Sequence, residues 1–82
     1  MSYEKVHQAK LKKVGLKQTL KSIEQQEADE VLIAQDADPE IIKKVINSCQ
    51  EHGIPYSYVD SMKKLGKTCG IEVGAATVAL KK

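Results

Sequence analysis

Two lysines and a glutamine follow a glycine where the sequence predicts the start of a helix. Lys17, Gln18 and Lys21 occupy adjoining positions of its first two turns, because residues three and four apart are neighbours on a helix. The helix N-terminus after Gly15 offers unpaired backbone N–H groups and favours negative charge. Lysine can contact phosphate there, and the amide can both donate and accept hydrogen bonds at a base edge. The same residues also fit an ordinary solvated helix, so this short motif leaves both interpretations open.

The thirteen lysines of the chain are unevenly distributed, although the net charge is only +2. Residues 1–23 carry six lysines and one acidic residue, and residues 61–82 carry five lysines and one acidic residue. The segment 24–60 between them carries nine acidic residues and two lysines. If the fold brings the two basic segments together, they form a patch that suits an anionic partner. If they stay apart, the surface is simply mixed and solvated.

Composition limits the class of protein. A length of 82 residues with 41% hydrophobic residues predicts one folded domain. No apolar run approaches the length of about 18 residues that spans a membrane, so we expect a cytoplasmic protein without a membrane partner. Cys49 and Cys69 lack metal-ligand spacing, which favours reduced, mostly buried thiols over a disulfide. No cofactor is expected.

Helical and extended patterns alternate along the chain. The helices are expected at residues 3–10, 16–26, 39–51 and 62–69, and the strands at 12–14, 31–34, 54–59 and 76–80. The expected caps and stops of the helices are Ser2, Asp38, Gly53, Ser61 and Gly70. The apolar stripe of the second helix is Leu16, Leu20 and Ile23. This order predicts an α/β fold, a three-layer α/β/α sandwich with a small mixed four-stranded sheet.

Two short motifs suggest other chemistry. Gly66-Lys67-Thr68 looks like the end of a phosphate-binding P-loop, but Ser61 stands where that loop needs its first glycine. Asp36 and Asp38 follow a strand and could hold Mg²⁺. Helix capping by Asp38 is the favoured interpretation, since Pro39 follows it at the first helical position. No Cys/His or Ser/His/acid set stands out, so we do not expect an enzyme.

A second informative segment runs from Ser61 to Ala76. It contains Gly66, Gly70 and Gly74, and its lysines precede a run of small residues. Glycines at this density allow the backbone to approach a partner closely. Alone, the segment predicts only a loop beside a helix.

Four ordered motifs together resemble a known family. They are Gly15-x-Lys17-Gln18-x-x-Lys21, residues 33–39, Ile54-Pro55-Tyr56 and Leu65-Gly66-Lys67-x-Cys69-Gly70-Ile71. They are similar to the kink-turn-binding proteins of archaeal and eukaryotic ribosomes and snoRNPs, most of all to the short bacterial YbxF-type branch. The resemblance covers essentially the whole chain. It implies an α/β/α sandwich that recognises a sharply bent RNA duplex built around tandem sheared G·A pairs.

The resemblance also implies which residues bind RNA. The family usually reads the G·A pairs with Gly-x-Asn-Glu-x-x-Lys; Gly15 and Lys21 match, while Lys17 and Gln18 replace the Asn and Glu. In the family a flipped-out nucleotide sits in a second pocket, where Met62 replaces a usual lysine. The residues of this chain at or beside that pocket are Asp38, Ile42, Met62, Lys63, Ile71, Glu72, Val73, Gly74, Ala75 and Ala76.

The sequence therefore predicts a monomeric, non-enzymatic module that binds structured RNA containing a kink-turn, in ribosomal RNA or a riboswitch. Two alternatives stay open at this point. A protein-interaction domain of the same fold would not bind RNA, because fold does not fix function. A small metal-dependent enzyme would use Asp36 and Asp38.

Overall fold

The computed structural model describes residues 3–82, which form helices and strands in alternation. The helices are α1 (Glu4–Gln8), α2 (Leu16–Glu24), α3 (Pro39–His52) and α4 (Met62–Thr68). The strands are β1 (Leu11–Val14), β2 (Glu30–Ala34), β3 (Tyr56–Val59) and β4 (Thr77–Lys81). The predicted cap Ser2 lies outside the described residues.

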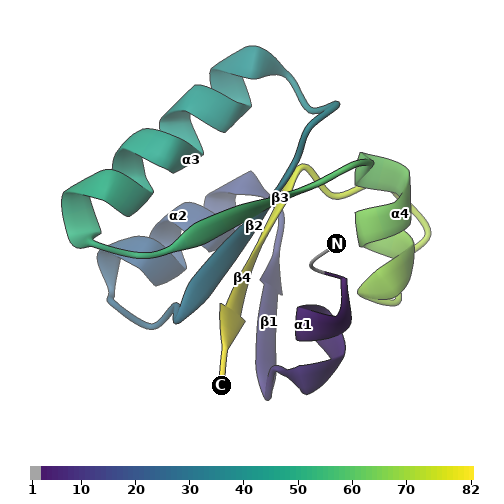
Figure 1. Cartoon of the computed structure of the whole chain (residues 1–82), viewed down its shortest axis with the longest axis horizontal. Coiled ribbons are helices and arrows are strands. Elements are labelled where there is room, and N and C mark those ends of the chain that lie inside the picture. The colour runs from purple at the N-terminus through teal and green to yellow at the C-terminus, as the bar shows by residue number, and fades with distance from the viewer. Residues whose placement is uncertain (1–2) are drawn as a thin grey trace.

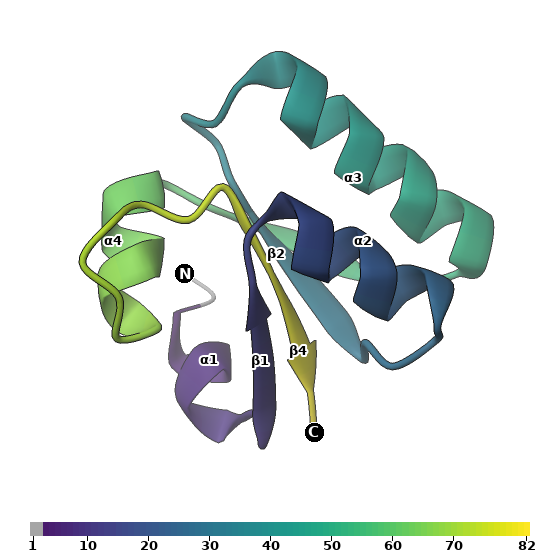
Figure 2. The ribbon, with the colours of Figure 1, turned by 180° about the vertical axis from the view of Figure 1, so that it is seen from behind.

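The strands form one mixed sheet in the order β1-β4-β2-β3. Strand β4 runs antiparallel to both β1 and β2, whereas β2 and β3 are parallel. Helices α2 and α3 cover one face of the sheet, and α1 and α4 cover the other (Figures 1 and 2). The predicted α/β/α sandwich with a mixed four-stranded sheet is confirmed.

The inner strand β2 contributes to two apolar cores, one on each face of the sheet. Leu32 and Ala34 pack with Val6 of α1 and Leu65 of α4. Val31 and Ile33 pack on the other face with Ile23 of α2 and with Val45 and Cys49 of α3. Alternate side chains of a strand point to opposite faces, so an apolar run of this length is what a doubly covered strand requires.

The predicted helix signals of the second half of the chain are confirmed. The Asp38 carboxylate accepts a hydrogen bond from the Glu40 amide at 2.8 Å, with Pro39 at the first helical position. Gly53 ends the same helix in the left-handed conformation, at φ 66°. The Ser61 hydroxyl accepts from the Lys64 amide at 3.1 Å and caps α4.

Several predicted element ends were wrong, and the predicted buried stripe of α2 was confirmed only in part. Strand β3 begins at Tyr56 rather than at residue 54, because Pro55 has no N–H to donate to a ladder. Helix α1 ends at Gln8, since Ala9 is already extended. On α2, Ile23 is buried as expected, but Leu16 and Leu20 are only partly buried and Thr19 and Ser22 lie fully inside. These small side chains let the helix approach the sheet closely.

Candidate nucleic-acid interface

The start of α2 and the loop between α4 and β4 lie side by side. The Gly15 amide donates to the Thr77 carbonyl at 2.9 Å, and Val14 is paired with Val78 in the sheet. The first turn of α2, within residues 15–21, is therefore held next to the end of the loop, within residues 70–76, where the loop enters β4 (Figures 1 and 2). We call these two segments together the tip.

Gly15 makes the sharp turn from β1 into α2. Its φ of 100° and ψ of 164° are strained for any residue with a Cβ atom. Its carbonyl accepts the first helical hydrogen bond, from the Thr19 amide at 3.0 Å. No side chain caps this helix, so the first-turn N–H groups are left for solvent or a ligand.

The loop is fixed on α4 through two glycines. A Cβ atom on Gly66 would lie 2.1 Å from the Val73 carbonyl oxygen, and one on Gly74 would lie 3.2 Å from the Met62 Cβ atom. The Ala75 amide also donates to the Met62 carbonyl at 3.0 Å. Gly66 is buried inside α4. It therefore lets the loop pack closely on the helix, and the expectation that it faces a partner was wrong. It is equally unlike a P-loop glycine.

The loop between β2 and α3 contacts the start of α4, beside the tip. The Asp36 carboxylate accepts a hydrogen bond from the Met62 amide at 2.8 Å and so caps α4 across the molecule. Asp38 caps α3, so both aspartates suggested above for Mg²⁺ hold helix ends. Within residues 3–82 no group of three or more His, Cys, Asp or Glu side chains is placed to hold a metal ion.

The predicted site residues divide by exposure. Lys17, Gln18 and Lys21 are exposed on α2, and Val73 on the loop is 70% exposed. The other exposed members are Asp38, Lys63, Glu72 and Gly74, and the partly buried ones are Gly15, Ile42, Met62, Ile71 and Ala76. Ala75 is 2% exposed and packs in the core, so only its main chain can contact a ligand.

The lysines of the tip have no acidic partner in the part of the chain that is described. The ion pair in the described residues joins Lys5 to Glu30 at 2.7 Å, away from the tip. The ammonium groups of Lys17 and Lys21 in the tip, and of Lys63 on α4, are therefore available to an anionic ligand. Exposed, unpaired lysines beside free helix N–H groups can bind phosphate, and Gln18 and Val73 add an amide and an apolar contact.

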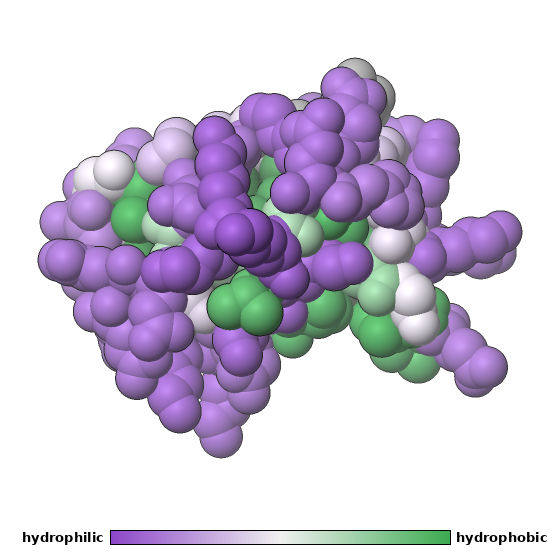
Figure 3. Space-filling model, turned by 90° about the horizontal axis from the view of Figure 1, so that it is seen from below, coloured by the Kyte–Doolittle hydropathy of each residue, from purple (hydrophilic) through white to green (hydrophobic). Residues whose placement is uncertain are grey.

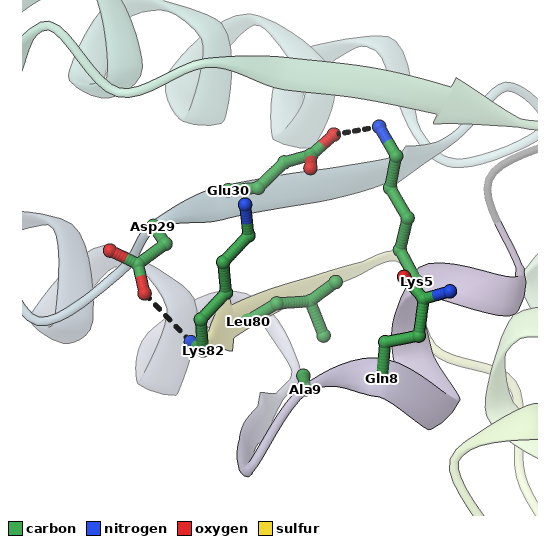
Figure 4. A pocket seen from close by; sticks show the side chains of 7 residues that line it. All are labelled: Lys5, Gln8, Ala9, Asp29, Glu30, Leu80 and Lys82. Atoms are coloured by element: carbon green, nitrogen blue, oxygen red, sulfur yellow. Dashed lines mark hydrogen bonds and ion pairs between the residues drawn. The ribbon is translucent and has the colours of Figure 1, made fainter.

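A cavity of about 210 Å³ lies at the other end of the sheet. Figure 4 shows its wall, where the Lys82 amide donates to the Asp29 carboxylate at 2.7 Å and Lys5 pairs with Glu30. Lysine and acidic side chains are equal in number in this wall. Apolar atoms gather in the middle of this end and hydrophilic residues surround them (Figure 3). Because its lysines are balanced by acidic side chains and Lys5 is paired with Glu30, the cavity is a less suitable site for a polyanion than the tip.

Sequence patterns gave no signal for a contact that anchors α4. The Tyr3 hydroxyl donates to the Asp60 carboxylate and accepts from the Ser61 amide at 3.3 Å. The Lys64 ammonium group lies 5.3 Å from the centre of the Tyr3 ring. Burial and the bond to Asp60 raise the pKa of Tyr3, and the same bond lowers the pKa of Asp60. The partners lie 57 residues apart, so no local pattern predicts them.

Both cysteines are free thiols, as expected. Burial raises the pKa of Cys49 to about 11. Burial also raises the pKa of Cys69, against a smaller opposing effect of the Lys12 charge. Within residues 3–82, none of the helices has the length and apolar character needed to span a membrane.

Comparison with known proteins places this geometry in a family. The family model described as ribosomal protein L7Ae/L30e/S12e/Gadd45 matches residues 2–82. An RNA-binding protein of Halalkalibacterium halodurans is 62% identical over the full length of both chains. The RNA-binding protein YbxF of Geobacillus stearothermophilus is 54% identical over 98% of both chains.

Among solved structures, a 15.5kD RNA-binding protein of Giardia lamblia superposes with a TM-score of 0.82 at 32% identity, covering 98% of this chain and 67% of that one. The family expected from the sequence motifs is confirmed. The chain belongs to the ribosomal protein L7Ae/L30e/S12e/Gadd45 family.

Proposed function

We propose that this protein binds structured RNA through the tip, without catalysing a reaction, and that its target is a kink-turn. The observation that carries the proposal is the convergence of α2 and the glycine loop at one end of the sheet, with unpaired lysines on the exposed surface. The relatives named as RNA-binding proteins, which match the chain along its whole length, support the RNA ligand.

The side chains of α2 suit the junction of a bent duplex. Bases at an irregular junction are accessible, unlike those in the deep groove of regular RNA helices. Gln18 can accept from guanine N–H groups through its carbonyl and donate through its NH₂ group. Lys17 and Lys21 can contact guanine acceptors or the phosphates beside them, and they supply the salt-dependent part of the affinity.

The loop is suited to a nucleotide that leaves the stack. Val73 presents an apolar surface for an unstacked base, and Ile71 and Met62 lie partly exposed nearby. Because Gly66 and Gly74 fix the loop on α4, little conformational entropy is lost when RNA binds. A protein arranged in advance for the bent RNA shifts the RNA population towards the bent state by its differential affinity.

One titration tests the proposal. The protein is titrated into a kink-turn RNA and into a matched RNA in which the tandem G·A pairs are changed to Watson–Crick pairs. We expect monomeric protein to bind the first RNA at least tenfold more tightly, because only that RNA presents the bent junction. Equal affinities would refute kink-turn recognition.

A second measurement concerns the cellular target. Ribosomal RNA and a riboswitch are the two candidate carriers of the motif. Crosslinking in cells, followed by sequencing of the bound RNA, identifies which of them the protein occupies. Capture of a protein partner that survives ribonuclease treatment, together with no RNA crosslinks, would instead favour an interaction domain.

A further inference from the structure

Strand β1 forms one edge of the sheet and carries a row of exposed lysines. Lys10, Lys12 and Lys13 are exposed, and so is Lys81, which is paired with Leu11. The Lys10 amide donates to the Lys81 carbonyl at 2.9 Å, so the extended chain begins at Lys10. In the described chain none of these lysines forms an ion pair. We call these four residues the β1 track.

The track is continuous with the tip. Strand β1 runs directly into Gly15, and the five steps of extended chain from Lys10 to Gly15 span about 17 Å. The lysines project on both sides of the edge. Lys12 is paired with Leu80, on the α1/α4 face, and Lys13 is paired with Ala79, on the α2/α3 face. An anionic backbone lying along this edge would meet ammonium groups on both of its sides.

Protection of a sheet edge is the other explanation for these lysines, since charge on an edge strand hinders pairing with another chain. Strand β3, at the opposite edge of the sheet, shows that edge protection does not fully explain these lysines. Strand β3 has no charged residue, and its Tyr58 side chain is exposed. This sheet therefore tolerates an uncharged edge. Glu27, an acidic neighbour of Lys13 and Lys81, makes no ion pair in the described residues.

We propose that the β1 track is a second RNA contact surface, which holds the phosphate backbone of a duplex that continues from the bend bound at the tip. This proposal rests on the proposed function. Lysine suits such a role because it contacts phosphates as a point charge and reads no base sequence. The tip would thus provide discrimination, and the track would add affinity for any duplex long enough to reach Lys10.

The test compares two double variants of equal charge change. In Lys12→Gln/Lys13→Gln the track loses two charges, and in Lys43→Gln/Lys44→Gln two exposed lysines of α3 are lost as a matched control. Both are titrated at several salt concentrations with the kink-turn RNA and with RNAs in which each flanking duplex is cut to a few base pairs. Circular dichroism and the urea midpoint verify folding.

The track variant is expected to bind the long RNA about tenfold more weakly than the control variant, with a salt slope smaller by about 1.5. The difference should vanish when one particular flanking duplex is shortened, and the preference for G·A pairs should persist. Identical affinities and slopes for the two variants on all RNAs would overturn the proposal.

Failure of the track is distinguishable from failure of kink-turn recognition. If wild-type protein does not discriminate between bent and Watson–Crick RNA, the proposed function fails on that comparison alone. The salt slopes of the two variants on the Watson–Crick duplex then still decide whether the β1 track contacts phosphates. Self-association of the track variant with an unchanged salt slope would assign its lysines to edge protection and refute the track.

Discussion

Lys5, at one end of the sheet, and the lysines of the tip, at the other, differ in their partners. At one end, Lys5 is paired with Glu30, which also accepts a hydrogen bond from Ser57 at 2.8 Å. At the tip, Lys17 and Lys21 are exposed and have no acidic partner among the described residues. The amino-acid composition does not show which lysines bind a ligand. The ionic partners show it, because a paired charge stabilises the fold and an unpaired one stays available to a ligand.

Side chains also contribute differently at the two ends. At the cavity end, backbone hydrogen bonds such as that from the Asp29 amide to the Leu80 carbonyl are joined by side-chain contacts of Lys5 with Glu30 and of Asp29 with the Lys82 amide. At the tip, the loop is fixed by its packing on Gly66 and by backbone hydrogen bonds. The exposed side chains of the tip are therefore free to contact a ligand. A rigid scaffold with free side chains is what a binding surface requires.

The largest expected effect breaks the scaffold of the tip. Replacing Gly66 by valine puts side-chain atoms where the Val73 carbonyl lies, since even a Cβ would be 2.1 Å from that oxygen. We expect the free energy of unfolding to fall by about 3 kcal/mol, measured by urea denaturation, and RNA affinity to fall with it. Lys67→Ala, an exposed change on the same helix, should stay within about 0.5 kcal/mol. Equal stability of the two variants would contradict the packing described here.

The next effect sharpens the contrast between free and paired lysines. Lys21→Ala should weaken binding of the kink-turn RNA about tenfold, about 1.4 kcal/mol, without changing the urea midpoint. Gln18→Ala should weaken it less. Lys5→Ala is the matched control at the other end, and we expect it to leave affinity unchanged and to cost at most about 1 kcal/mol of stability. Equal losses of affinity from Lys21→Ala and Lys5→Ala would show that the unpaired lysine of the tip has no special role in RNA binding.

The smallest effect concerns the anchor of α4. The pKa of Tyr3 is raised in the folded state, so its hydroxyl stabilises the fold below about pH 10 and this contribution is lost as the pH rises further. The pKa of Asp60 is lowered, so its contribution is present at neutral pH and is lost in acid. Tyr3→Phe should therefore lower the urea midpoint at neutral pH and match wild type more closely at both extremes. A constant difference across pH would argue against the hydroxyl contact.

The sequence predicted those features that depend on nearby residues. The apolar run at β2, the Asp38 cap with Pro39 and the stop at Gly53 are each encoded within a few positions. Thr19 and Ser22 were missed because their burial depends on how closely α2 approaches the sheet, and polarity normally predicts exposure.

The candidate site was predicted by resemblance more than by physical pattern. Four ordered motifs placed the α2 residues and the loop in one site, whereas the charge distribution only allowed them to meet. The Asp36 cap on α4 joins residues 26 positions apart, and the role of Gly66 depends on a carbonyl of another segment. Contacts of this kind follow from tertiary packing, which no local pattern encodes.

The most direct test of the account maps the RNA on the protein. Amide signals of the ¹⁵N-labelled protein are followed by NMR during titration with the kink-turn RNA. We expect the largest shifts at residues 15–21 and 70–76 and little change in the wall of the cavity around Lys5, Asp29 and Glu30. Shifts concentrated at that cavity, with the tip unperturbed, would contradict this expectation.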